Sequence, residues 1–342
     1  MGVMHESLHT RPSDPFGVRV ATATVVAESH DVSIDDEAIE RVARHLAGDA
    51  GESPAWDDRL HYRGQPLDTA GWVVVLDTLN FCFWAQGDDP DERWRVTWRD
   101  TTHNGYDALA AALHRAVVDD GLAIWDGVWL RDLAEADVRH LLRGDDGCPP
   151  IPLIDARLAN LRELGTVVEG RHAGDLVVAA AGSAIRLVRT VVEQLPSFRD
   201  VARWTRPGGE AIEVPFLKRA QILAADLAGA LAGTELAITE GLDRLTAFAD
   251  YKVPQVLRQR GVLRYAPGLA ERIRRLERIP EGSPEEVAIR AATVQACERL
   301  VSALGRLGIS TTASELDWRL WTLGQSLPGE SEPYHRTVTI FY

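Results

Sequence analysis

The sequence predicts a mainly α-helical protein with a small β-sheet, and three observations support this fold class. Apolar residues recur with i, i+3, i+4 spacing in segments that cover about half of the chain. Strand-like patterns are confined to residues 72–76, 94–99 and 334–342. Neither a repeat nor a low-complexity linker divides the chain, so we expect one compact domain over residues 18–342.

The first residues differ from the rest. Residues 1–17 are mostly polar and lack the apolar stretch of a signal peptide, and we expect them to form a disordered N-terminal tail. No apolar run in the chain reaches the roughly 18 residues that a membrane span needs. We therefore expect a cytoplasmic protein without a membrane partner.

The charge balance argues against a nucleic-acid polymer as partner. The 342 residues include 51 acidic and 37 basic side chains, which gives a net charge of −14. A surface that binds tRNA or DNA needs basic side chains to neutralise phosphates. A small substrate with one phosphate needs only one basic pocket. We expect such a small-molecule substrate, and a monomeric protein.

Metal sites and common nucleotide motifs are not indicated. The three cysteines, Cys82, Cys148 and Cys297, have no paired spacing, which argues against a disulfide framework and a structural zinc site. The ten histidines show no metal-ligand spacing. No Walker loop, GxGxxG, HExxH or GxSxG motif is present, so a kinase, a dehydrogenase or a zinc enzyme has little support.

The N-terminal third mixes helix and expected strand. Ser33 is placed to cap a helix that runs to about residue 46. Residues 72–76 indicate a buried strand or a tight core segment, and residues 94–99 alternate like a strand that pairs with it. Because buried polar groups need partners, the polar residues that follow should fix a turn or face a pocket. These residues are Asp77, Thr78 and Asn80.

The middle of the chain is helical in pattern. Helices are expected over residues 106–118, 133–143, 154–168 and 176–195, with a break at residues 144–152. The last of them is almost continuously apolar and should be central. Pro215 occupies a first-turn position of a further helix, which carries Lys218 and Gln221 on one face and Asp226 in its middle.

The C-terminal third begins with a clear helix start. Ser283 and Pro284 are typical cap and first-turn residues of a helix that runs to about Leu304. A last helix is expected over residues 315–321. The alternation in residues 334–342 predicts a final strand.

Residues 248–264 combine several side chains suited to ligand binding. Phe248, Asp250 and Tyr251 place a ring, a carboxylate and a phenol directly before Pro254, where a helix should begin. Three cations follow: Arg258, Arg260 and Arg264. This order suits a flat polar ligand with an anionic tail. The structural alternative is a helix N-terminus with Asp250 near its cap and the rings in the core.

Asp317 is the clearest candidate for chemistry. It lies between Leu316 and Trp318, with Trp321 one turn further on. A carboxylate against Trp is desolvated, and it can stabilise positive charge at a sugar carbon or attack that carbon. The structural alternative is an ion pair with Arg319 or another arginine on the surface.

Three further residues have both a functional and a structural interpretation. Lys218 near a helix start suits a phosphate, but a solvated lysine fits the pattern equally. His61 is either a ligand contact or an ordinary core or surface histidine. His335, beside Tyr334 and Arg336, forms a phosphate or lid contact or belongs to an exposed tail.

Several stretches, in this order, resemble one family. They are Leu76–Trp84, Leu195–Asp200, Phe216–Leu223, Phe248–Gln255, Leu316–Trp321 and the end from His335 to Tyr342. Together they make the chain similar to the queuosine salvage proteins, the queuosine 5′-phosphate N-glycosylase/hydrolase family. The resemblance covers about residue 18 to the C-terminus.

The resemblance implies both a fold and an activity. The family is largely helical and is compared with helical DNA glycosylases. It is implied to hydrolyse the N-glycosidic bond of queuosine 5′-monophosphate, which releases the base queuine, and to need no metal or organic cofactor. The alternatives are another nucleotide N-ribohydrolase and a non-catalytic helical protein that binds a nucleotide or base.

The resemblance also gives hypotheses for individual residues. Asp317 serves the sugar side, Asp250 the base edge, and these two roles are exchangeable at this stage. Lys218 is a cation near the phosphate or the reaction centre. The remaining expected substrate-binding residues are His61, Phe248, Tyr251, Arg258, Trp318 and His335.

Overall fold

The computed structural model describes residues 13–48, 56–84, 92–325 and 331–342. These residues form fourteen α-helices and three two-stranded antiparallel sheets. The predicted mainly α-helical fold class is therefore confirmed. The likeness to helical DNA glycosylases stays a prediction. None of the helices in the described ranges is long and apolar enough to cross a membrane.

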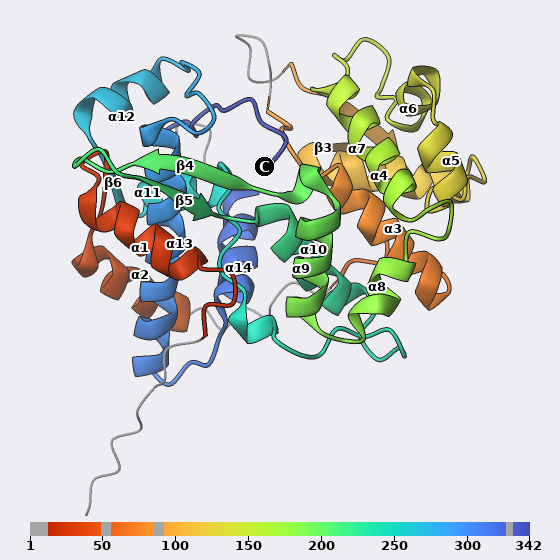
Figure 1. The fold of residues 1–342 in the computed structure, drawn as a ribbon. Coiled ribbons are helices and arrows are strands. Elements are labelled where there is room, and N and C mark those ends of the chain that lie inside the picture. The colour runs from red at the N-terminus through yellow and green to blue at the C-terminus, as the bar shows by residue number, and fades with distance from the viewer. Residues whose placement is uncertain (1–12, 49–55, 85–91, 326–330) are drawn as a thin grey trace, which may run out of the picture.

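The helices pack around two hydrophobic cores, which lie on opposite sides of the molecule (Figure 1). The first core is built mainly by α3 (Pro66–Thr78), α4 (Gly105–Val118), α5 (Gly127–Asp132), α6 (Glu135–Leu141), α7 (Ile154–Val167), α8 (Asp175–Ala180), α9 (Ala184–Gln194) and α10 (Lys218–Ala230). The second is built mainly by α1 (Val18–Glu28), α2 (Asp36–Gly48), α11 (Lys252–Gln259), α12 (Pro267–Arg274), α13 (Pro284–Arg306) and α14 (Ala313–Gln325).

Helix α13 is the centre of the second core. It contacts α1, α2, α11 and α14, which surround it. Its start follows the prediction, because the Ser283 hydroxyl accepts a hydrogen bond from the Glu286 N–H at 3.3 Å and Pro284 occupies the first turn. The cap and the proline satisfy or remove N–H groups that have no partner inside the helix.

The three sheets are short hairpins or ribbons that link the helices. β1 (Val32–Ile34) pairs with β6 (Leu263–Tyr265), and β2 (Arg95–Trp98) pairs with β3 (Thr101–Asn104). β4 (Val201–Thr205) and β5 (Ala211–Pro215) form a hairpin that packs on α13 and α1. Two 3-10 turns, η1 (Pro196–Phe198) and η2 (Leu242–Arg244), complete the described elements.

The strand predictions for residues 72–76 and 334–342 are wrong, whereas the alternative of a tight core segment for residues 72–76 agrees with their burial. Residues 72–76 belong to α3, and β2 pairs with β3 instead. Every residue of α3 from Thr69 to Thr78 is buried, so the helix has no polar face and its pattern shows no helical period. Residues 334–342 form no strand; their link to the rest includes one isolated bridge between Arg278 and Arg336.

Several predicted helix boundaries also shift. Asp35, not Ser33, caps α2, because its Oδ1 accepts a hydrogen bond from the Ala38 N–H at 2.7 Å. Pro215 ends β5, and α10 begins three residues later. The helix expected over residues 176–195 is two helices, separated where Ala181 and Gly182 adopt left-handed backbone angles. Local pattern does not reveal these breaks.

The expected disordered tail lies mostly outside the described residues. Of residues 1–17, the structure describes the last five. There the Asp14 carboxylate accepts a hydrogen bond from the Val20 N–H at 2.9 Å, and the Phe16 ring packs against both cores. The tail and the single domain over residues 18–342 stay predictions.

Candidate active site

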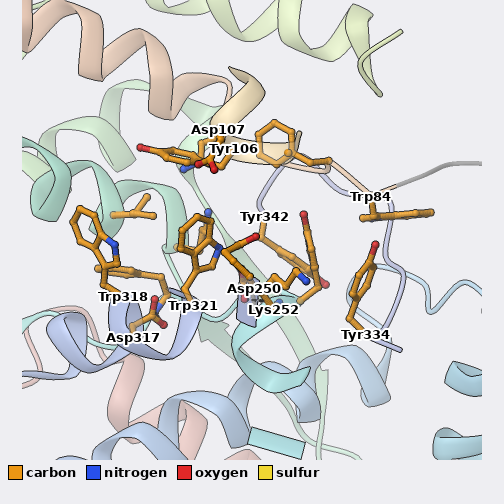
Figure 2. A pocket seen from close by; sticks show the side chains of 18 of the residues that line it. Trp84, Tyr106, Asp107, Asp250, Lys252, Asp317, Trp318, Trp321, Tyr334 and Tyr342 are labelled. Atoms are coloured by element: carbon orange, nitrogen blue, oxygen red, sulfur yellow. Dashed lines mark hydrogen bonds between the residues drawn. The ribbon is translucent and has the colours of Figure 1, made fainter. Parts of the chain in front are cut away.

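A cavity of about 280 Å³ lies where the two cores meet. Its walls come from α4 and α10 on the side of the first core and from α14 and residues 248–252 on the side of the second. Figure 2 shows Asp317 and Trp318 at one end of the lining side chains and Trp84 and Tyr334 at the other. The two ends of the cavity are therefore lined by different side chains.

Asp317 projects from α14 into this cavity and is 4% exposed. Its Oδ1 accepts a hydrogen bond from the Phe248 N–H at 2.9 Å, the one donor that the described residues offer to this carboxylate. Burial, and secondly the charge of Asp250, raise the pKa of Asp317 well above its ordinary value, while Lys218 opposes the shift. Asp317 thus has one oxygen held and one available to a ligand.

Asp250 both begins a helix and lines the cavity. Its Oδ1 accepts hydrogen bonds from the Lys252 and Val253 N–H groups at 2.8 and 2.9 Å, which starts α11 two residues before Pro254. Burial raises the pKa of Asp250, and the charge of Lys218 lowers it. The structural and the ligand-facing interpretations of this residue are therefore compatible.

Lys218 is the first residue of α10, and its side chain is buried against the cavity, not solvated. Among the described residues its ammonium has no hydrogen-bond or ion-pair partner. Burial lowers the pKa of Lys218, whereas Asp250, Asp77 and Asp317 raise it. One cation thus lies within the field of several buried carboxyl groups.

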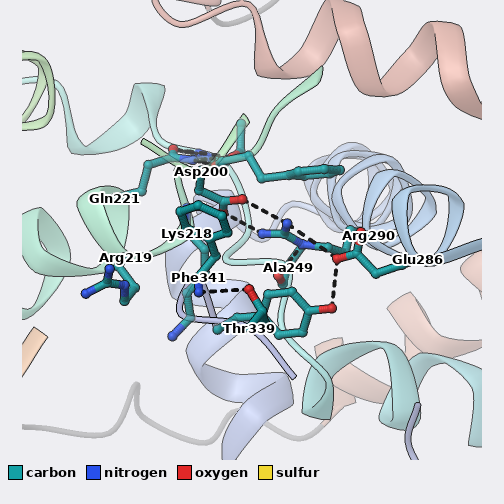
Figure 3. A network of polar contacts seen from close by, with 12 residues as sticks. Asp200, Lys218, Arg219, Gln221, Ala249, Glu286, Arg290, Thr339 and Phe341 are labelled. Carbon is teal, nitrogen blue, oxygen red and sulfur yellow. Dashed lines mark hydrogen bonds and ion pairs between the residues drawn. The ribbon is translucent and has the colours of Figure 1, made fainter. Parts of the chain in front are cut away.

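A buried network fixes the backbone at Lys218 and at Ala249, the residue before Asp250 (Figure 3). The Arg290 guanidinium donates to both oxygens of Asp200 at 2.9 and 2.5 Å and to the Ala249 carbonyl at 3.1 Å. Asp200 in turn accepts a hydrogen bond from the Lys218 N–H at 3.1 Å. The same arginine lies over the ring of Tyr342, whose hydroxyl donates to Glu286. The network therefore joins α13 to both walls of the site.

Two buried arginines shape the segment after α3. Arg157 donates to the carbonyls of Phe81 and Cys82 at 2.6 and 3.3 Å, and Arg219 donates to the Thr78 carbonyl at 2.7 Å. Burial lowers the pKa of Arg157 to about 9 and that of Arg219 to about 10, so both remain charged at neutral pH. These contacts present Asn80 to the cavity.

Aromatic rings cover much of the cavity wall. The predicted residues Phe248, Tyr251 and Trp318 all line it. Six aromatic residues beyond the predicted set do so too, and two of them, Tyr106 and Trp321, meet edge to face with centroids 5.8 Å apart. A flat base has several π surfaces on which to stack.

Three predicted binding residues do not line the cavity. His61 is stacked on Trp56 behind the wall and reaches the cavity only through Tyr106. His335 is buried behind Tyr342, and burial lowers its pKa to about 3. Arg258 forms an ion pair with Glu332 at 2.9 Å, away from the lining side chains.

Two buried carboxyl groups near Lys218 are not among the predicted site residues: Asp226, for which the sequence predicts no role, and Asp77, which it predicts to fix a turn or face a pocket. Asp226 lines the cavity, and burial raises its pKa well above the ordinary value. Its spacing was a usable signal, because Lys218, Ile222 and Asp226 follow i, i+4, i+8 and share one face of α10. Asp77 lies behind the wall, and burial raises its pKa to about 7.

The described part of the chain contains no group of three or more His, Cys, Asp or Glu residues placed to hold a metal ion. The cations that line the cavity there are Lys218, Lys252 and Arg93. What the cavity offers is a set of carboxyl groups, three cations and aromatic rings. Such a set suits a nucleotide, with stacking for its base and positive charge for its phosphate.

Comparison with known proteins gives consistent matches. A family model described as queuosine salvage protein matches residues 60–342. A queuosine 5′-phosphate N-glycosylase/hydrolase of Sphaerobacter thermophilus is 44% identical over 97% of this chain and 99% of its own length. Proteins with the same description from Bos taurus and Mus musculus are 34% and 31% identical, over 94% and 96% of this chain and 97% and 99% of their own lengths.

Proposed function

The chain belongs to the queuosine salvage protein family, and from this premise we propose that it hydrolyses the N-glycosidic bond of queuosine 5′-monophosphate and releases queuine. The observation that carries the proposal is the meeting of Asp317, Asp250 and Lys218 in one aromatic-walled cavity. The predicted family resemblance is confirmed by the match over residues 60–342.

The chemistry of the bond defines what the site must do. Breaking it builds positive charge at C1′ of the ribose and negative charge on the departing base. Queuine is a 7-deazaguanine and has no N7 to protonate, so the usual way of activating a purine base is closed. The protein must therefore stabilise the sugar cation and the base through other groups.

Asp317 serves the sugar in our proposal. Its free oxygen faces the cavity in a buried setting, where a negative charge stabilises a developing cation more strongly than in water. As a carboxylate it stabilises C1′ and takes a proton from the attacking water. Lys218 lines the same cavity, and its charge lowers the pKa of Asp317, Asp250 and Asp226 alike, which supports a position among these carboxyl groups and not at the phosphate.

In this proposal the phosphate is bound by the other two cations that line the cavity, Lys252 and Arg93. The Lys252 ammonium lies 5.5 Å from the centre of the Tyr334 ring. Figure 2 shows Tyr334 at the end of the lining side chains opposite Asp317, with Lys252 between them. A phosphate between Lys252 and Tyr334 suits a nucleotide that lies along the cavity. Three predicted binding residues do not touch the substrate in this proposal and instead support the residues that line the cavity. They are His61, Arg258 and His335.

Asp250 binds the base edge, and replacing it should weaken substrate binding more than turnover. Asp250→Asn keeps an oxygen for the Lys252 and Val253 N–H groups but places an amide against the N1–H and exocyclic amine of the base. We expect KM to rise about 10- to 100-fold, because a hydrogen bond to a charged group contributes about 1.5–3 kcal/mol. A kcat within about threefold of the unchanged protein is the second expected result.

Steady-state kinetics on both proteins measures this split. Asp243→Asn, which changes an exposed carboxylate in η2, is the matched control and should leave both constants unchanged. A variant in which kcat falls while KM stays constant would instead assign Asp250 to the reaction itself, in exchange with Asp317.

The activity is tested by liquid chromatography with queuosine 5′-monophosphate, queuosine and guanosine monophosphate as substrates, each with and without chelator. We expect queuine to be released from the monophosphate, with the same rate in chelator. Cleavage of guanosine monophosphate at a similar rate would favour a general nucleotide N-ribohydrolase. Binding without release of any base would favour a non-catalytic carrier.

We also propose that the substrate is the free nucleotide and that the protein acts as a cytoplasmic monomer. The net charge of −14 supports the first point, since a tRNA needs a basic surface. A tRNA affinity in the substrate assay buffer that falls steeply with salt concentration would contradict it.

A further inference from the structure

Asp226 has no part in the mechanism above, although it lines the same cavity as Asp317 and Lys218. It lies in α10 two turns after Lys218 and is 4% exposed. Its Oδ2 is buried without a hydrogen-bond partner in the described structure. A buried carboxylate in this position is costly unless it is paired or protonated.

The hydrogen bonds of its neighbour Tyr106 decide which form Asp226 takes. His61 Nδ1 lies 3.0 Å from the Asp57 carbonyl oxygen, which only accepts, so Nδ1 carries the proton. Burial lowers the pKa of His61 to about 4, and the ring is neutral at neutral pH. Its Nε2 is therefore an acceptor, and it receives the single phenol proton of Tyr106 at 2.9 Å.

Tyr106 consequently offers Asp226 an oxygen and not a proton. A phenol proton turned toward Asp226 would lower the pKa of that carboxyl group, but His61 holds it. Burial and the charge of Asp77 raise the pKa of Asp226, and Lys218 alone of the nearby cations opposes them. The groups that face this part of the cavity are Lys218, Tyr106, Asp107, Asp250 and Asp317, and Asp77 lies behind the wall.

We propose that Asp226 is held as a neutral carboxylic acid by the Tyr106–His61 pair and donates its proton to the departing base. This inference rests on the proposed function and adds a third catalytic residue to it. The bond from C1′ to the base nitrogen breaks with its electron pair on the base, which takes the Asp226 proton. Water adds its oxygen to C1′ and gives one proton to Asp317. Return of that proton to Asp226 through solvent restores the site.

The division of labour follows from the two environments. Asp317 accepts a backbone N–H, which favours its charged form. Asp226 accepts no backbone N–H in the described structure, which leaves its neutral form favoured. Each of the two also has a buried carboxyl neighbour, Asp77 for Asp226 and Asp250 for Asp317, so the backbone N–H is the difference between them. Two carboxyl groups whose surroundings differ in this way are suited to opposite roles in one reaction.

The first test is Asp226→Asn, which keeps the shape but cannot give up a proton. We expect kcat for queuosine 5′-monophosphate to fall about 10²- to 10⁴-fold, with an unchanged Kd for the substrate by calorimetry. Asp243→Asn is the exposed control. Turnover within about threefold of the unchanged protein, or a loss of affinity as large as the loss of rate, would overturn the proposal.

The second test uses His61, which touches Asp226 only through Tyr106. In His61→Phe the ring still stacks on Trp56, but the Tyr106 proton is released and can turn toward Asp226. The carboxylate form is then stabilised, so the alkaline limb of kcat/KM should move to lower pH by about one unit. In a Tyr106→Phe background the same His61 change should move nothing. An unshifted limb in His61→Phe, or an equal shift in both backgrounds, contradicts the relay.

The same assays separate the proposed function from the role of Asp226. If the unchanged protein releases no queuine, the proposed function fails. If it does and Asp226→Asn is equally active, only the role of Asp226 fails.

Discussion

Asp317→Asn removes nearly all turnover while the substrate still binds. The amide oxygen continues to accept the Phe248 N–H, so the backbone around the base is unchanged. What disappears is the negative charge next to C1′, and losses of about 10³-fold or more in kcat are expected for a group that stabilises transition-state charge in a buried site. Asp317→Ala should be at least as inactive.

The measurement is single-turnover release of queuine beside a direct binding assay, with Asp243→Asn as the control. A near-normal kcat in Asp317→Asn would remove Asp317 from the reaction centre. The unchanged protein offers a further check, because Asp317 works as a carboxylate. Burial raises its pKa, so kcat/KM should decline as pH falls through a value above the ordinary carboxyl range, and Asp317 is lost as a base on the acid side.

Arg290→Met should have the largest effect on stability. The side chains of Arg290 and Asp200 are 2% and 3% exposed, and removing the arginine leaves a carboxylate buried without its partner. Breaking such a pair costs about 3–5 kcal/mol in free energy of unfolding. The Arg290 contact to the Ala249 carbonyl is lost as well, so the segment that carries Asp250 loosens.

Urea unfolding, followed by tryptophan fluorescence, measures the change. Arg299→Met is a matched control on the same helix, because its ion pair with Asp36 is exposed at 41% and 78% and should contribute less than about 1 kcal/mol. Equal midpoints for the two variants would mean that the buried network does not stabilise the fold.

Local sequence predicts several residues that line the cavity, but few of the residues that contact them from behind. Asp317, Asp250 and Lys218 were recognisable because each combines an ionisable group with an unusual neighbour, a Trp, an aromatic pair or a helix start. The sequence pattern assigns no role to Asp226, although its spacing from Lys218 places both residues on one helix face. The reason is that the proposed role of Asp226 depends on Tyr106 and His61, which are distant from it in the sequence.

The fold was predictable where helices have a polar side and a marked start. Helix α13 has both, with Ser283 as its cap. Helix α3 has no polar side and no side-chain cap. Because it is buried on every side, its apolar residues do not recur with the helical spacing on which the prediction relies. The alternation in residues 334–342 reflects contacts with the cavity and with the segment after α3, including the hydrogen bond from the Cys82 N–H to the Tyr342 oxygen at 2.8 Å, and not a sheet.

Because the cavity lies between the two cores, a ligand bound in it contacts residues of both. Lys218 and Asp226 belong to a helix of the first core, whereas Asp250 and Asp317 are carried by the second. A nucleotide that contacts both sets favours the arrangement in which the cores are docked, and docking favours the nucleotide by the same factor. Substrate binding and the packing of the two cores against each other are thus thermodynamically coupled.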